Sequence, residues 1–201
     1  NKFLAISDWT AYDFLCHTGR HVDGIIPNYV DRKIIGTGTN CLKRTKTVVA
    51  ISANEVYKDL HYLENSFHSS TISSTHELII VSRNFQGSHD STKVLSNLSN
   101  QELKRILQVS DCIVISSLFE GFGFPYYEAL LNNKTVFAFS NPVAMSISTL
   151  SDLVKIYNKV DVHLVDLFDQ YKNSSGSFNS NLVCSAKEIQ KKYYEFETNC
   201  L

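Results

Sequence analysis

The stretch Ser110–Asn141, with the sequence SDCIVISSLFEGFGFPYYEALLNNKTVFAFSN, decides the fold class of this chain. It contains two apolar runs, Cys112–Ile115 and Thr135–Phe139, which predict strands. Between them lie a loop with two glycines and then Tyr126–Asn132, which we expect to be a helix because Pro125 suits a helix's first turn. Runs that are apolar throughout are typical of strands covered on both faces. The stretch therefore predicts a strand–helix–strand unit of a parallel sheet.

The same alternation continues on both sides of this stretch. Further apolar runs rich in β-branched residues predict strands at Val22–Ile26, Thr47–Ile51, Leu78–Val81 and Val162–Val165. Capping boxes at Ser99–Glu102 and Ser185–Glu188 predict the starts of two helices, and apolar spacing predicts another over Leu60–Phe67. The alternation predicts an α/β fold, a Rossmann-like doubly wound parallel sheet with helices on both faces. Ligands of such sheets bind outside the carboxyl ends of the strands.

Composition and charge argue against several classes of protein. The 201 residues are 43% apolar and 19% charged, which predicts one folded domain over residues 1–201. The 19 basic and 20 acidic residues give a net charge of −1, so no excess of positive charge supports binding of nucleic acid. The five cysteines are scattered without a Cys-x-x-Cys pair, which favours a reducing, cytoplasmic location over a disulfide framework. No apolar run approaches the roughly 20 residues that a membrane-spanning helix needs.

The loop between the two strands of the opening stretch carries the chemistry. Gly121 and Gly123 let backbone amides approach a ligand, and the helix that follows offers free N–H groups at its start. Glu120 in the loop and Glu128 in the first turn of the helix can accept hydrogen bonds from hydroxyl groups. A ligand with both phosphate and sugar hydroxyls fits this combination. The alternative is an ordinary strand–turn–helix junction in which Glu128 only complements the helix dipole.

The segment Glu120–Ala129, EGFGFPYYEA, resembles the E-x7-E signature of retaining GT-B glycosyltransferases, in the form E-G-F-G-L-P-x-x-E-A of glycosyltransferase family 4. Leu98–Asp111, Ile26–Asp31 and Ser7–Thr10 resemble the flanking motifs of that family in the same order, so the likeness extends over nearly the whole chain. The resemblance implies that the chain is the C-terminal, donor-binding half of a GT-B fold. It also implies that the N-terminal acceptor domain is absent from these residues.

The resemblance also implies roles for individual residues. Glu120 would bind the donor sugar and Lys58 the diphosphate, as the two catalytic residues, while Glu128 would bind the ribose. Backbone groups near the donor sugar and phosphate would come from Gly121, Phe122, Gly123 and Phe124. Leu95 would contact the base, with core packing as the alternative, and the alternative for Lys58 is a solvated lysine at a helix start.

One departure from the family concerns a cation. Ser52–Asn54 stands where the family has G-R-L, so the arginine that grips the diphosphate is missing. A charge-assisted hydrogen bond contributes about 1.5–3 kcal/mol, so its loss would weaken diphosphate binding about ten- to a hundredfold. Lys43, Arg44 and Lys46 precede a strand and fall at its amino end, whereas Arg83 follows the strand Leu78–Val81. Arg83 is therefore the candidate replacement, and the site is either specialised or degenerate.

The resulting hypothesis is retaining transfer of a sugar from a nucleotide-diphosphate sugar to a sugar, lipid or protein acceptor. No cofactor or metal is expected, because His17 and His21 lack a third ligand and no Asp-x-Asp motif is present. The expected partner is an N-terminal GT-B domain, and membrane contact is expected only through parts outside this chain. Two alternatives stay open: a non-catalytic nucleotide-sugar binding or assembly module, and a GT-B-shaped enzyme of another reaction, such as a phosphorylase or epimerase.

Overall fold

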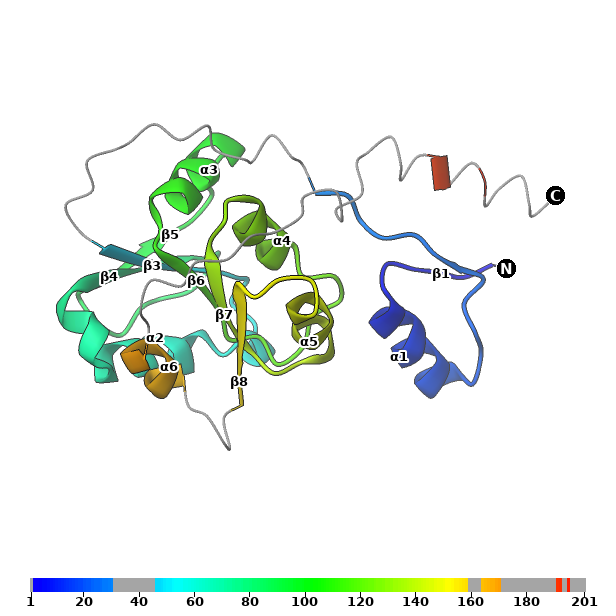
Figure 1. Cartoon of the computed structure of the whole chain (residues 1–201), viewed down its shortest axis with the longest axis horizontal. Helices are drawn as coiled ribbons and strands as arrows, with labels where there is room; N and C mark the ends of the chain where they lie inside the picture. The colour runs from blue at the N-terminus through cyan, green and yellow to red at the C-terminus, as the bar shows by residue number, and fades with distance from the viewer. Residues whose placement is uncertain (1, 31–45, 159–163, 171–190, 193–194, 196–201) are drawn as a thin grey trace.

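The computed structural model describes residues 2–30, 46–158, 164–170, 191–192 and 195. Among these residues, six strands form one parallel sheet in the order β5-β4-β3-β6-β7-β8 (Figure 1). The strands are β3 (Lys46–Ile51), β4 (His76–Val81), β5 (Thr92–Leu95), β6 (Cys112–Ile115), β7 (Thr135–Phe139) and β8 (Val154–Tyr157). The chain proceeds outward from β3 to β5, returns to β6 and proceeds outward again to β8. The order of the strands therefore reverses between β3 and β6, which is where doubly wound sheets bind ligands.

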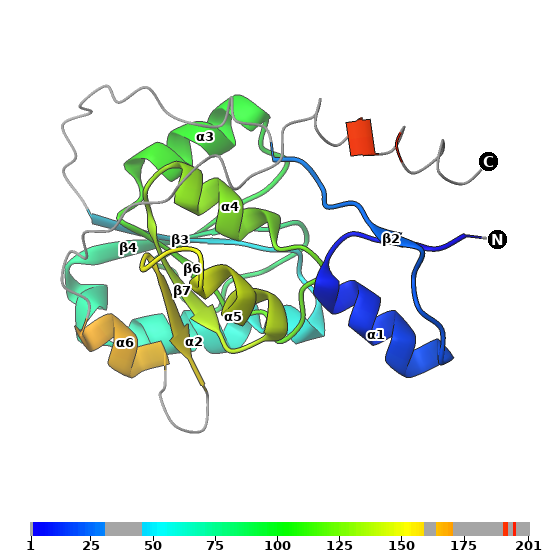
Figure 2. The same ribbon diagram turned by 45° about the vertical axis from the view of Figure 1, so that its right-hand side comes forward.

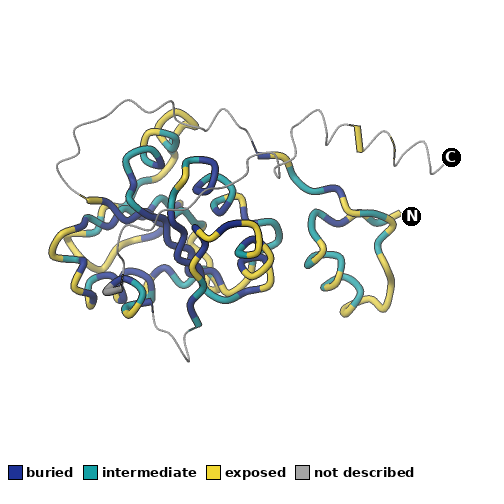
Figure 3. Tube along the Cα trace, viewed as in Figure 1, coloured by how far each residue is buried: buried dark blue, intermediate teal, exposed yellow. Residues whose placement is uncertain are grey.

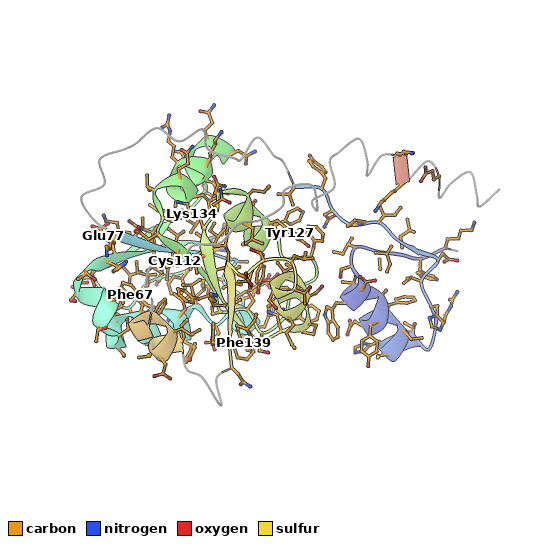
Figure 4. All side chains as sticks on the ribbon, in the orientation of Figure 1. Phe67, Glu77, Cys112, Tyr127, Lys134 and Phe139 are labelled. Atoms are coloured by element: carbon orange, nitrogen blue, oxygen red, sulfur yellow. The ribbon has the colours of Figure 1, made fainter. Side chains whose placement is uncertain are left out.

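Helices cover both faces of the sheet (Figure 2). The helices and 3₁₀ turns that follow β3 are η2 (Val56–Lys58), α2 (Leu60–Ser69), η3 (Thr71–Ser74), α3 (Asn100–Val109), α4 (Phe124–Leu131), α5 (Pro142–Ser148) and α6 (Leu164–Gln170). Side chains of α2 and α6 pack with Val48 and Ala50 of β3, whereas α3, α4 and α5 pack with Val49 on the opposite face. Figure 4 marks Phe67 of α2 and Cys112 of β6, which belong to the first of these two cores.

Several sequence predictions are confirmed. The four central strands are present, and all four side chains of β6 are buried. Ser99 caps α3 by accepting from the backbone N–H of Glu102, while the Glu102 carboxylate accepts from the backbone N–H of Ser99. Helix α4 carries Pro125 in its first turn, but Glu128 lies one turn further in than expected.

One predicted strand is shorter than expected and lies outside the central sheet, and another is a helix in its described part. The run at Val22–Ile26 yields only β2 (Gly24–Ile25), which pairs with β1 (Leu4–Ala5) apart from the central sheet. Of Val162–Val165, the last two residues begin helix α6, and the other two lie outside the described residues. The helix expected from Ser185 also falls largely outside them.

Two strands at the edges of the sheet were not predicted from the sequence. β5 and β8 each contain an exposed lysine, Lys93 and Lys155, which breaks the apolar run. A charged side chain suits an edge strand because it discourages pairing with another chain. Edge position therefore explains why these strands lack the pattern of the central ones.

The N-terminal unit β1–α1–β2 lies beside the sheet domain (Figure 1). Helix α1 (Asp8–Thr18) starts at the capping residue Ser7 and ends at Gly19, whose φ of 68° is left-handed. No residue of α1 is buried within the described structure, and Figure 3 colours this helix teal and yellow, for intermediate and exposed, whereas the central strands are dark blue. The unit contacts the rest of the domain through side chains that are only partly buried in α1, among them Trp9, which packs against the core of α3, α4 and α5.

The connection from β4 to β5 contains no helix and is fixed by a buried carboxylate. Glu64 of α2 is fully buried and accepts from the backbone N–H of Ser88 at 3.0 Å, its hydroxyl at 2.8 Å, and the backbone N–H of His89 at 3.2 Å. Burial by itself raises the pKa of Glu64, but these hydrogen bonds and one from Thr92 outweigh it and lower the pKa overall. The carboxylate thus holds the segment that begins directly after Arg83.

Within the described residues, no helix is long and apolar enough to cross a membrane.

Candidate functional site

A cavity of about 540 Å³ opens at the carboxyl edge of the sheet, where the strand order reverses. Segments that follow β3, β4, β5 and β6 all contribute to it, as do η2 and the start of α4. The volume falls in the range of small-molecule sites, which is roughly 300–1,000 Å³. The sheet topology therefore forms the cavity where the sequence analysis expected a ligand.

The cavity has an apolar side and a charged side. Its apolar side chains include Ile51, Val81, Leu95, Leu98 and Leu103. Its charged side chains include the cations Lys58 and Arg83 and the carboxylates Glu55 and Glu120. An apolar slot beside a mixed cluster of charges suits a ligand with a flat apolar part and a polar, anionic part.

Lys58 and Glu120 form an ion pair at the charged side. Their side-chain atoms Nζ and Oε1 are 2.6 Å apart, and only 12% and 11% of the two side chains are exposed. Lys58 ends the 3₁₀ turn η2, and its ammonium group also lies 5.1 Å from the centre of the Tyr57 ring. The Coulomb attraction within a pair this enclosed is stronger than within a surface pair, because less water screens the two charges. The two residues assigned to catalysis thus come together, although they are 62 positions apart.

Hydrogen bonds fix the start of the loop that carries Glu120. The Ser116 hydroxyl donates to the backbone carbonyl of Lys58, and the backbone N–H of Leu118 donates to the carbonyl of Tyr57 at 2.7 Å. On the other side, the buried amide of Asn141 donates to the carbonyl of Ser117 at 2.9 Å. The loop and η2 therefore form one unit, which holds Glu120 against Lys58.

The two glycines of the loop have different structural roles. Gly123 has a φ of 81° and precedes α4, and a Cβ atom there would lie 2.8 Å from Cδ2 of Tyr126 and 3.1 Å from Cγ1 of Val143. Gly121 has no positive φ, and a Cβ atom there would meet Cδ1 of Ile6 at an ordinary 3.5 Å. Only Gly123 is therefore required by the backbone itself.

The other predicted residues are divided between the cavity and its surroundings. Arg83 is exposed and follows β4, and Leu95 is half-buried at the end of β5, and both line the cavity. Gly121, Phe122, Gly123, Phe124 and Glu128 are not among the described residues that line it. Glu128 is half-buried in α4, where burial raises the pKa of its carboxyl group.

The sequence analysis did not identify Ser52 as a site residue. Its hydroxyl oxygen is buried without a hydrogen-bond partner among the described residues, and Ser52 lines the cavity. Nearby, the Asn54 amide donates to the carbonyl of Asn84 at 2.8 Å and so connects the segments after β3 and β4. The signal was present in the sequence, because Ser52 directly follows the carboxyl end of a predicted strand.

No cluster of three or more His, Cys, Asp or Glu side chains suited to a metal occurs in the described part of the chain. Of the cations expected at the amino end of β3, Lys46 is its exposed first residue, and Lys43 and Arg44 lie outside the described ranges.

Comparison with known proteins gives matches in structure but not in sequence. No family model matches the chain, and no curated protein matches it. The chain is similar to HepE from Anabaena, solved in complex with UDP, with a TM-score of 0.71 and 15% identity over 98% of this chain and 64% of that one. A further HepE structure contains UDP-glucose.

Two further solved structures are similar. One is WaaG, a glycosyltransferase of lipopolysaccharide biosynthesis, with a TM-score of 0.67 and 12% identity over 84% of this chain and 52% of that one. The other is the lipopolysaccharide outer core galactosyltransferase WaaB, with a TM-score of 0.65 and 14% identity over all of this chain and 62% of that one. The chain thus spans about half to two thirds of these proteins. At such identities the likeness establishes the fold, which is the Rossmann-like α/β fold found in GT-B glycosyltransferases.

Proposed function

We propose that this chain binds a nucleotide-diphosphate sugar and forms the donor-binding part of a retaining GT-B glycosyltransferase similar to family 4. The observation that carries the proposal is the cavity at the reversal of the strand order, with the enclosed pair of Lys58 and Glu120 at its charged side. The fold shared with WaaG and with UDP-bound HepE supports the same assignment. The span of about half to two thirds of these proteins agrees with a separate N-terminal acceptor domain.

The apolar side and the charged side of the cavity suit one orientation of the donor. The base lies in the apolar slot near Leu95, and the diphosphate lies between Lys58 and Arg83. The sugar then reaches Glu120. The contacts proposed for the backbone N–H groups of Gly121, Phe122, Gly123 and Phe124, and for Glu128 with the ribose hydroxyls, need a ligand that extends beyond the cavity, because these residues do not line it. Burial raises the pKa of Glu128, and a hydroxyl that donates to its carboxylate would lower that pKa again.

In the reaction, negative charge develops on the leaving diphosphate as the glycosidic bond breaks. Lys58 stabilises that charge from a fixed position, because the ion pair with Glu120 and the contact with Tyr57 already orient it. Glu120 orients the sugar through its hydroxyls and does not attack it. The Ser52 hydroxyl, buried and unpaired in the described structure, is a further donor toward the phosphate.

The rest of the assignment follows from the proposed family. The acceptor is a sugar, a lipid or a protein bound by the other domain, and no metal takes part. Cytoplasmic location agrees with the free thiols of Cys16 and Cys112.

A second candidate is a binding module that does not catalyse transfer. It is favoured by one observation: Ser52, Ala53 and Asn54 stand where the family has its arginine, and the charge of Lys58 is already balanced by Glu120. Product analysis with sugar nucleotides and the complete protein separates the two candidates. Transferred sugar supports the enzyme, whereas tight binding without transfer supports the module.

The test of the proposal is calorimetric titration of the chain with UDP, GDP, ADP and their sugar conjugates. We expect saturable binding of one nucleotide series. Lys58→Gln should weaken that binding about ten- to a hundredfold, since it removes a charge-assisted hydrogen bond. Lys46→Gln, at the opposite end of β3, is the matched control and should leave the affinity unchanged. A folded chain that binds none of these ligands would refute the proposal.

A further inference from the structure

We propose that Ser7 is a positioning residue, which holds the Glu120 loop from the side of helix α1. Its consequence for sugar binding rests on the function proposed above, whereas its effect on the loop does not. The observation is a hydrogen bond of 2.8 Å from the Ser7 hydroxyl to the backbone carbonyl of Gly121, the residue after Glu120. The two partners are 114 positions apart, so the bond joins the N-terminal unit to the candidate site.

Two acceptors lie within reach of the Ser7 hydroxyl hydrogen: the Gly121 carbonyl at 2.8 Å and the Thr10 hydroxyl oxygen at 3.2 Å. The Thr10 backbone N–H donates to the Ser7 hydroxyl at 3.1 Å, which caps helix α1. The Thr10 hydroxyl donates to the carbonyl of Ser7 at 2.9 Å, so its own hydrogen is already used. A serine hydroxyl has a single hydrogen. The Gly121 carbonyl is the nearer of the two acceptors, so the hydrogen of Ser7 goes to Gly121, while its lone pairs serve the cap.

This bond closes the far side of the Glu120 loop. The near side is fixed at Leu118 by the carbonyl of Tyr57, and Glu120 lies between that anchor and Gly121. Packing supports the same contact, because Gly121 faces Cδ1 of Ile6 and Cγ2 of Thr10. Without the Ser7 bond, the peptide after Glu120 would lose this hydrogen bond, and the ion pair with Lys58 and the packing at Gly121 would have to hold the carboxylate.

The Ser7 hydrogen bond acts beside apolar contacts of α1 with the sheet domain. Trp9 packs against the core that includes side chains of α3, α4 and α5, and its ring lies edge-on to Phe119, with ring centres 6.3 Å apart. A displacement of α1 would act directly on the Gly121 peptide through the Ser7 hydrogen bond. The N-terminal unit thereby communicates with the site that it borders.

Three substitutions separate positioning from helix capping. Ser7→Thr keeps both the donor and the acceptor. Ser7→Asp keeps a good helix cap but has no hydrogen to donate to Gly121. Ser7→Ala removes both functions. The Asp variant is therefore the decisive one, because a residue that only caps the helix would tolerate it.

The first readout is amide hydrogen exchange, which needs no ligand. In Ser7→Asp, we expect exchange over residues 119–122 to become about five- to tenfold faster, as loss of one hydrogen bond implies, while α1 stays as in the wild type. Ser7→Thr should match the wild type, and Ser7→Ala should speed exchange in both segments. Wild-type exchange of the loop in Ser7→Asp would overturn the proposal.

The second readout is calorimetric affinity for UDP-glucose and for UDP. Ser7→Asp should weaken UDP-glucose binding about five- to tenfold and UDP binding less, because the sugar contacts Glu120 directly whereas the diphosphate depends on Glu120 only through Lys58. An equal loss for both ligands would overturn the positioning role. If the wild type binds neither ligand, the proposed function fails, and the exchange experiment still decides whether Ser7 holds the loop.

Discussion

Replacing Gly123 by alanine tests whether the Glu120 loop turns into α4 as described. The residue has a φ of 81°, and the new Cβ atom would lie 2.8 Å from Cδ2 of Tyr126 and 3.1 Å from Cγ1 of Val143. The left-handed conformation costs an alanine about 1–2 kcal/mol. Crowding of buried neighbours adds about 1–3 kcal/mol, since Tyr126 and Val143 are both packed in the core. We therefore expect the free energy of unfolding to fall by about 2–5 kcal/mol.

The measurement is urea unfolding of the chain followed by circular dichroism, with Gly121→Ala as the matched control. Gly121 has no positive φ, and its nearest neighbour would be Cδ1 of Ile6 at 3.5 Å. The control should stay within about 1 kcal/mol of the wild type. Equal losses in the two variants, or a Gly123→Ala protein as stable as the wild type, would refute this account of the turn.

Three further substitutions test how the fold supports the site. Glu64→Gln should flatten the pH dependence of the free energy of unfolding, because the pKa of Glu64 is lowered in the folded state. Such a group stabilises the fold fully above the usual glutamate pKa of about 4.3, and that stability is lost as the pH falls through the folded pKa. Urea unfolding from pH 2 to 6 measures the change. Lys134→Met should lower the free energy of unfolding by about 1–3 kcal/mol, because the ammonium group of Lys134, which Figure 4 labels, donates to the carbonyls of Gln108 and Ser110 at the end of α3. A change below about 0.5 kcal/mol would contradict this. Asn141→Ala should cost about 1–3 kcal/mol in the same assay and loosen the loop at Ser117, since the buried side chain also caps α5.

The centre of the fold could be predicted from the sequence because its signals are local. β6 and β7 are buried on both faces, so their apolar runs are uninterrupted. Edge strands carry a weaker pattern, as Lys93 and Lys155 show. The run at Val22–Ile26 was misassigned because apolar β-branched residues do not say which sheet a strand joins.

The site shows the same division between local and distant information. Lys58, Arg83, Leu95 and Glu120 were selected from motifs or because they follow strands, and parallel topology brings them to one cavity. The ion pair of Lys58 with Glu120 and the bond from Ser7 to Gly121 join residues 62 and 114 positions apart, so no local pattern could reveal them. The hydrogen bonds of Glu64 to Ser88 and His89 join residues 24 and 25 positions apart, so they have no local pattern either.

The central claim is that the cavity at the carboxyl edge binds a nucleotide-diphosphate sugar. Titration of isotope-labelled chain with UDP-glucose, followed by backbone amide NMR shifts, tests it most directly. We predict saturable shifts concentrated in residues 51–58, 82–83, 95–98 and 116–125, the segments that contribute residues to the lining of the cavity. The absence of saturable shifts, or shifts concentrated at the amino edge near Asp111 and Lys134, would contradict the claim.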